Sequence, residues 1–86
     1  MKRGSVTISL KGHDEGKFYI VTQVCDDYAL LCDGKNKTLE KPKKKKLKHI
    51  AETHEWVDLC VYNPLYDAHI KKILKAYNKK GGCYLG

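Results

Sequence analysis

The stretch FYIVTQVCDDYALLCDG, residues 18–34, decides the fold class of this chain. Residues 18–25 are rich in β-branched and aromatic side chains, which favour a strand. Asp26-Asp27 follows as a tight turn, residues 28–32 form a second apolar run, and Asp33-Gly34 is a typical hairpin signal. The stretch therefore predicts neighbouring antiparallel strands joined by a short turn.

Further strands are expected on both sides of this pair. Residues 5–10 alternate, with Val6, Ile8 and Leu10 facing the core and the Ser and Thr residues facing the other way. On the other side, residues 37–40 read as a short strand that Pro42 ends, because proline cannot donate to a ladder. Residues 43–46 are then expected as an exposed loop tip, and residues 47–51 as a fifth strand.

The C-terminal third changes to a helical period. Ile70, Ile73, Leu74 and Tyr77 follow the i, i+3, i+4, i+7 spacing of one helix face. We expect a helix over 67–80, ended by Gly81-Gly82. Five short strands and one helix predict a mainly β fold, a small five-stranded barrel with a C-terminal helix. Its parts are the barrel (1–52, with a basic loop at 41–48), a connecting segment (53–66), the helix and a flexible tail (81–86).

Positive charge is concentrated in one segment of the chain. The chain of 86 residues has a formal net charge of +7. Residues 35–48 hold eight lysines and one acid, Glu40, whereas the remaining basic and acidic residues balance. Such a patch attracts polyanions, of which nucleic acid is the commonest in a cell. The candidate RNA-binding residues in this segment are Lys35, Lys37, Lys41, Lys43, Lys44, Lys45, Lys46 and Lys48.

The kind of recognition follows from the residue type. Lysine is a point charge without the bidentate fork of arginine, so it positions a phosphate backbone rather than reading bases. The chain has a single arginine, Arg3. We therefore expect recognition of the backbone or shape of folded RNA. The simpler interpretation is a solvated loop that is basic for solubility.

The segment 11–17 (KGHDEGK) is a second candidate contact, through Lys11, His13 and Lys17. Its glycines are expected to form the turn; the turn glycines of the chain are Gly12, Gly16 and Gly34. Tyr19 and Tyr28 are the first candidates for base stacking, although aromatic residues of this kind are more often part of a core.

The remaining motifs exclude several classes of function. The four cysteines are irregularly spaced and are expected as reduced, mostly buried thiols. The set Cys25, Cys32, His49, His54 and Cys60 matches no zinc finger or ribbon, and His54-Glu55-Trp56-Val57-Asp58 lacks the second histidine of H-E-x-x-H. No nucleophile–base pair or phosphate-cradling glycine motif is present. We expect no enzyme, no metal and no cofactor.

The sequence also leads to expectations for location and assembly. No signal-peptide core and no bilayer-spanning apolar run is visible, so a cytoplasmic protein that does not contact the membrane is expected. We also expect the chain to be a monomer.

Several of these segments together resemble a known family. The strand GSVTISL (4–10), the loop KGHDEGK, the strand FYIVTQV and the run LEKPKKKKLKH (39–49) after Asp33-Gly34-Lys35 carry the resemblance. The chain resembles the KOW-domain RNA-binding proteins of low-GC Gram-positive bacteria. Those are similar to the KOW-bearing large-subunit ribosomal proteins of archaea and eukaryotes.

The resemblance implies an SH3-like barrel that binds RNA. It points to large-subunit ribosomal RNA, with ribosomal proteins as further partners and a ribosome-associated role. Gly16 corresponds to the turn glycine of the motif, and Lys41 with Lys43 to Lys46 corresponds to its basic loop. Residues 52–62 depart from the pattern, so the resemblance assigns them no function.

Two other interpretations remain open. SH3-like barrels also bind proteins, so the chain could be an interaction module of the translation or transcription machinery, in which its aromatic residues would matter most. The same lysines could also bind duplex DNA in a nucleoid-type role.

Overall fold

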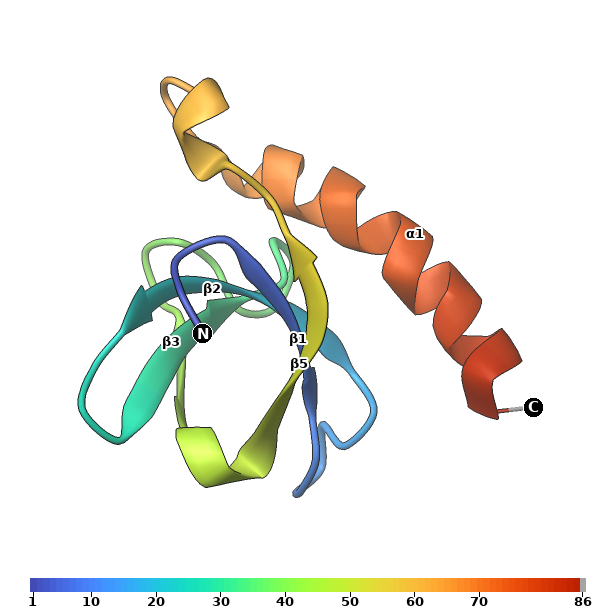
Figure 1. Ribbon diagram of the computed structural model, residues 1–86. Coiled ribbons are helices and arrows are strands. Elements are labelled where there is room, and N and C mark those ends of the chain that lie inside the picture. Colours follow the sequence, from blue (N-terminus) through green and yellow to red (C-terminus); the bar gives the residue numbers. More distant parts are fainter. Residues whose placement is uncertain (86) are drawn as a thin grey trace.

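The computed structural model describes residues 1–85, and it describes side chains up to Tyr77. The chain forms one five-stranded antiparallel sheet followed by a C-terminal helix (Figure 1). The mainly β fold with a terminal helix is thus confirmed. The elements are β1 (Ser5–Ser9), β2 (Phe18–Val24), β3 (Tyr28–Cys32), β4 (Lys43–Lys46), the 3-10 helix η1 (Leu47–His49), β5 (Ile50–Trp56), the 3-10 helix η2 (Leu59–Val61) and α1 (Asp67–Leu85).

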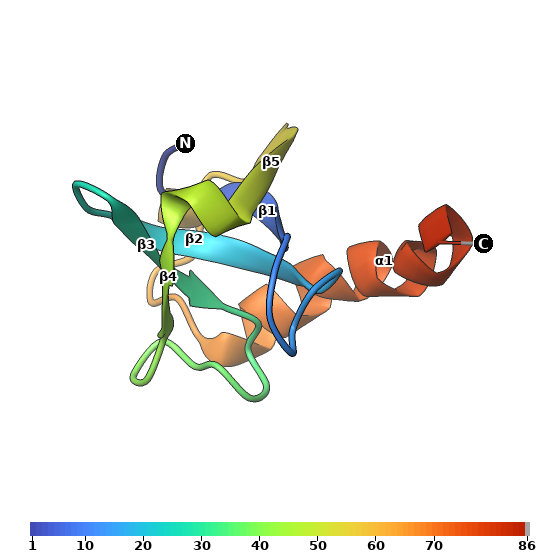
Figure 2. The same ribbon diagram turned by 90° about the horizontal axis from the view of Figure 1, so that it is seen from below.

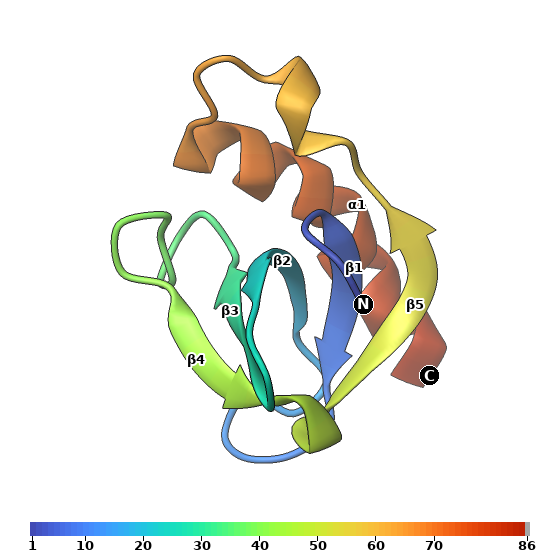
Figure 3. The same ribbon diagram turned by 60° about the vertical axis from the view of Figure 1, so that its left-hand side comes forward.

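The strand order of the sheet is β4-β3-β2-β1-β5, so the last two strands of the chain occupy its two edges. Only the three residues of η1 separate β4 from β5. The sheet therefore curves, and the two edges approach each other where η1 joins them (Figure 3).

Alternate side chains of the strands build two apolar clusters on opposite faces of the sheet. On the concave face, Tyr19, Val21, Ala29, Leu31 and Ile50 are buried together. On the convex face, along which α1 lies (Figure 2), a second buried cluster includes residues of this helix. Its members are Val6, Phe18, Ile20, Cys32, Leu59, Ile70 and Leu74. Because α1 covers this face, the central strands are apolar on both sides.

Because both faces of the sheet are covered, the side chains of β1 do not alternate between buried and exposed as the sequence predicted. Thr7 and Ser9 are buried rather than outward-facing, and Leu10 is 50% exposed. Thr7 Oγ1 donates to Tyr19 O (3.2 Å), and Ser9 Oγ donates to Asp14 Oδ1 (3.0 Å). The two hydroxyls are satisfied internally, so a short polar side chain can occupy a core position.

The expected strand at 37–40 is wrong. The segment after β3 is an irregular loop, because side chains capture the backbone donors that a ladder would need. Asp33 Oδ1 accepts the N–H groups of Lys35, Asn36 and Lys37 at 2.8, 2.9 and 2.8 Å.

The expected loop tip at 43–46 is also wrong, since these four lysines form β4 and pair with β3 in the register Leu31↔Lys43 to Tyr28↔Lys46. The expected fifth strand at 47–51 begins as η1 and becomes extended only at Ile50.

Two expected boundaries near the C-terminus also differ from the structure. Strand β5 continues to Trp56, into the segment 53–66 that was expected as a connection. Helix α1 continues through Gly81 and Gly82 to Leu85, so the expected helix end is wrong. Gly86, the last residue of the expected tail, lies outside the described residues. No helix in the described part of the chain is long and apolar enough to cross a membrane.

Candidate nucleic-acid interface

The lysines of β4 divide between the two faces of the sheet. Successive side chains of a strand point to opposite sides. Lys44 and Lys46 are accordingly exposed, whereas Lys43 and Lys45 are half-buried. Lys48, in η1, is also exposed. The predicted basic loop therefore presents only some of its charges to solvent, and we call Lys44, Lys46 and Lys48 the outward strip.

The inward lysines neutralise a buried carboxylate in the β1–β2 loop. Lys45 Nζ lies 2.9 Å from Asp14 Oδ1, and Lys43 Nζ lies 3.5 Å from Asp14 Oδ2. Burial by itself raises the pKa of Asp14, but the hydrogen bonds from Lys45 and Ser9 and the charge of Lys43 lower that pKa to about 2. Lys43 and Lys45 were expected to bind RNA; the structure places them in this internal ion cluster instead.

The cluster brings the second candidate contact to the side of β4. Lys45 Nζ also donates to Lys11 O (2.7 Å), which ties the β1–β2 loop to the lysine strand. Lys11, His13 and Lys17 are exposed on this loop. Gly12 and Gly16 have φ values of +94° and +88°, as the turn requires. The β1–β2 loop and β4, which are about 30 residues apart in sequence, thus lie side by side.

His49 lies in the combined field of these two segments. Its backbone carbonyl accepts the N–H of Leu10 at 2.9 Å, so it lies beside the start of the β1–β2 loop. Desolvation lowers the pKa of His49, and the charges of Lys11, Lys48, Lys45 and Lys46 lower the same pKa further. His49 is therefore close enough to both Lys11 of the loop and Lys46 and Lys48 of the strip for their charges to act on its pKa.

The two tyrosines that were proposed to stack on bases differ in how deeply they are buried. Tyr19 is only 2% exposed within the concave cluster, so the expectation that it stacks on a base is wrong. Tyr28 is half-buried on the outer side of β3, and Lys44 Nζ lies 4.2 Å above its ring centroid. Tyr28 therefore supports the outward strip through a cation–π contact.

The loop between β3 and β4 carries the remaining predicted lysines. Lys35 and Lys41 are exposed, and Lys37 is half-buried. Gly34 has φ +79° and packs against α1: a Cβ built there lies within 3 Å of Asp67 O and Lys71 N. Leu39 N donates to Asp67 Oδ1 (2.7 Å), which fixes the loop to the start of α1. The site lysines of this loop are thereby held next to the helix.

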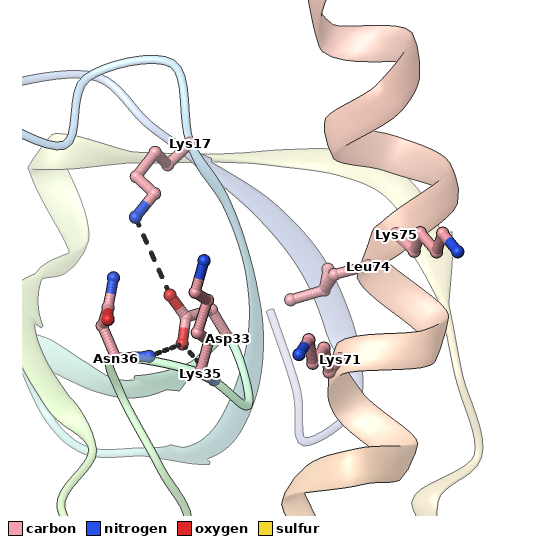
Figure 4. Close-up of a pocket in the computed structure, with 7 residues that line it drawn as sticks. All are labelled: Lys17, Asp33, Lys35, Asn36, Lys71, Leu74 and Lys75. Atoms are coloured by element: carbon pink, nitrogen blue, oxygen red, sulfur yellow. Dashed lines mark hydrogen bonds and ion pairs between the residues drawn. The ribbon is translucent and has the colours of Figure 1, made fainter.

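Two lysines of α1 also lie at the site, although no role was predicted for them from the sequence. Lys71 and Lys75 line a pocket together with Lys17, Asp33, Lys35, Asn36 and Leu74 (Figure 4). The sequence does contain a polar helix face on which Lys71 and Lys75 are four residues apart, but the sequence alone could not place that face against a loop.

The cysteines and histidines do not assemble into a metal site among the described side chains, where no group of three or more potential ligands is found. Cys32 is buried, but Cys25 is half-buried and Cys60 is exposed, so the expectation of mostly buried cysteines is wrong for these two. Burial raises the pKa of the Cys32 thiol to about 11, which keeps it protonated. The side chain of Cys83 lies outside the described residues.

The sequence matches no protein-family model, and no curated protein is significantly similar to it.

Proposed function

We propose that this protein is an RNA-binding module that grips the phosphate backbone of structured RNA through lysines. The observation that carries the proposal is the position of the β1–β2 loop beside β4, the strand that carries the outward strip, fixed by the hydrogen bond from Lys45 Nζ to Lys11 O. This arrangement brings the exposed cations of the loop next to the strand whose outer face carries Lys44 and Lys46. A surface of this kind binds a polyanion through release of its counterions.

The charges of the strip are available to a ligand. Lys44, Lys46 and Lys48 form no ion pair with any carboxylate in the described part of the chain. Residues two apart in a strand are about 7 Å apart, so Lys44 and Lys46 project from the same face at a distance that suits neighbouring phosphates of one strand. Their outward face is therefore suited to a nucleic-acid backbone rather than to a single small anion.

We further propose that the sheet is an SH3-like barrel of the KOW type. The support is the strand order with β4 and β5 at the edges, the curvature of the sheet, and the single 3-10 turn that joins those edges. The sequence resemblance then favours large-subunit ribosomal RNA as the partner, with ribosomal proteins as possible neighbours, for a cytoplasmic monomer.

A protein-interaction role is the second candidate, and one observation favours it. Trp56, Val61 and Tyr66 are large side chains that are 48%, 70% and 59% exposed around the β5–α1 connection. Large apolar side chains that a protein leaves exposed can mark a contact with another protein. This role would depend on these three residues and not on the lysines.

The test of RNA binding is a salt titration of affinity for an RNA hairpin, measured by fluorescence anisotropy. Replacement of Lys44, Lys46 and Lys48 by Gln should lower the slope of log K against log salt by about 2, at roughly 0.7–0.9 per phosphate contact. A variant that replaces Lys2, Arg3 and Lys72 by Gln loses the same charge elsewhere and serves as the control. Equal slopes for the two variants would exclude the outward strip as the site.

Two further experiments distinguish between the candidate binding partners. Duplex DNA that competes as well as the RNA hairpin would favour the nucleoid-type role. Sedimentation of cell lysate at low and high salt tests the ribosomal partner, because electrostatic binding predicts co-migration with the large subunit that is lost at high salt.

A further inference from the structure

A pocket of about 410 Å³ lies between the β3–β4 loop and α1 (Figure 4). Three segments supply its walls: the end of the β1–β2 loop, the turn after β3, and the second and third turns of the helix. Its lining residues are Lys17, Asp33, Lys35, Asn36, Lys71, Leu74 and Lys75.

The walls of the pocket are held in place by contacts within the protein. Gly34 packs so closely on α1 that an added Cβ would lie 2.7 Å from Lys71 N. The three backbone N–H groups that Asp33 accepts fix the turn, and Leu39 N anchors the loop to Asp67. A ligand would therefore meet a largely preformed site, which lowers the ordering cost of binding.

The pocket is positively charged, because its lining includes four lysines and only one carboxylate. That carboxylate is already used: Asp33 Oδ1 accepts the three N–H groups, and Oδ2 lies 3.8 Å from Lys17 Nζ. These partners lower the pKa of Asp33 despite its burial, so it stays ionised as a fixed part of the wall. Lys35, Lys71 and Lys75 form no ion pair with any described carboxylate.

The other lining groups suit the organic part of a nucleotide. The side chain of Leu74 points toward the loop at the floor of the pocket, where it belongs to the buried convex cluster, and the amide of Asn36 is exposed and can both donate and accept a hydrogen bond. The volume lies in the range of about 300–1,000 Å³ typical of small-molecule sites, so it exceeds what a phosphate alone requires. In Figure 4 the Lys71 ammonium lies on the loop side of α1, whereas Lys75 points to the side of α1 away from the loop.

We propose that this pocket receives one nucleotide of the bound RNA, with its phosphate between Lys35 and Lys71 and its sugar or base beside the amide of Asn36. The proposal rests on the proposed function and extends it: the RNA would be held by the helix as well as by the outward strip. The β3–β4 loop connects the two surfaces, since Lys35 lines the pocket and β4 begins at the other end of that loop.

The test compares two neighbouring helix lysines. Lys71→Gln keeps the stem that packs near Gly34 but removes the charge, and Lys72→Gln removes the same charge from a residue that does not line the pocket. With an RNA hairpin at 0.1 M salt, Lys71→Gln should weaken binding about sixfold and lower the salt slope by roughly 0.7–0.9. Lys72→Gln should bind like the wild type, and Lys71→Arg should restore most of the affinity.

Equal affinity and equal slope for Lys71→Gln and Lys72→Gln would overturn the pocket proposal while leaving RNA binding by the strip intact. A second experiment does not depend on RNA. The NMR chemical shifts of the backbone amides of Lys35, Asn36 and Lys71 are followed during titration with AMP and with adenosine. Shifts with AMP but not with adenosine support a phosphate-dependent site even if the wild type binds no RNA, in which case only the RNA function fails. No shift with either compound, in a chain that binds no RNA, overturns both.

Discussion

Lys45 Nζ is 2.9 Å from Asp14 Oδ1, and the two side chains are only 10% and 11% exposed. This ion pair joins the β1–β2 loop to β4, so the positive surface depends on an internal charge pair. In a run of four consecutive lysines, one member is thus a structural residue.

The first prediction contrasts adjacent lysines. Lys45→Met removes one partner of a nearly buried pair and should lower the free energy of unfolding by about 3 kcal/mol, because Asp14 keeps Lys43 as its only cation beside the Ser9 hydrogen bond. Lys44→Met, on the exposed face, should change the free energy of unfolding by less than about 1 kcal/mol. Urea unfolding followed by circular dichroism measures both. Equal losses in the two variants would show that the ion pair does not stabilise the fold.

The second prediction concerns acid stability. The pKa of Asp14 is about 2 in the folded chain, below its ordinary value of 3.8. The stabilisation from its carboxylate is therefore fully present above pH 4 and is lost as the pH falls toward 2, a total of about 2 kcal/mol at 1.36 kcal/mol per pKa unit.

An Asp14→Asn variant isolates this contribution, because Asp33, whose pKa is also lowered, remains in both proteins. The difference in unfolding free energy between wild type and variant should narrow as the pH falls from 4 to 2. A difference that stays constant over this range would contradict the assignment.

The third prediction uses His49 as a sensor of the ligand. Desolvation and the charges of Lys11, Lys48, Lys45 and Lys46 lower its pKa in the free protein. Phosphates bound over the outward strip would offset those charges, so the pKa of His49 should rise when RNA binds. An NMR titration of its ring protons with and without RNA measures the change. RNA that binds without raising this pKa would have to bind on another surface.

The fourth prediction compares two glycines with similar backbone angles. Gly16 and Gly34 have φ values of +88° and +79°, but a Cβ at Gly16 meets nothing within 4 Å, whereas a Cβ at Gly34 lies 2.4 Å from Asp67 O. Gly16→Ala should therefore cost about 1 kcal/mol, the penalty of a left-handed conformation alone. Gly34→Ala must also separate the loop from α1 and should cost at least twice as much. Thermal unfolding of both variants tests the difference.

The sequence predicted those elements whose signals are local. Strand β3 coincides with the expected residues 28–32, and β2 ends one residue earlier than expected, because each is a compact apolar run. Strand β4 could not be predicted in this way. Four lysines have no local preference for a buried edge, and the carboxylate that draws two of them inward belongs to a loop about 30 residues earlier.

The candidate site also has a part that local sequence signals predict and a part that depends on tertiary contacts. Charge density correctly marked an exposed basic segment, since Lys44, Lys46 and Lys48 are all exposed. It could not separate these from Lys43 and Lys45, whose role depends on tertiary contacts. It also left Lys71 unassigned, because only the packing of α1 against Gly34 brings that lysine beside Lys35.

The uniform composition of β4 has a consequence for how its pairing with β3 is specified. In most strands a slip by one residue exchanges core and surface side chains, and that exchange penalises the wrong alignment. In a run of four lysines the exchange replaces lysine by lysine, so the strand carries no alignment information of its own. The alignment is set by its neighbour Leu47, whose side chain packs against the concave cluster and whose N–H donates to Asp27 O at 2.9 Å. The identity of the lysine that reaches Asp14 is therefore decided by the leucine that follows the run.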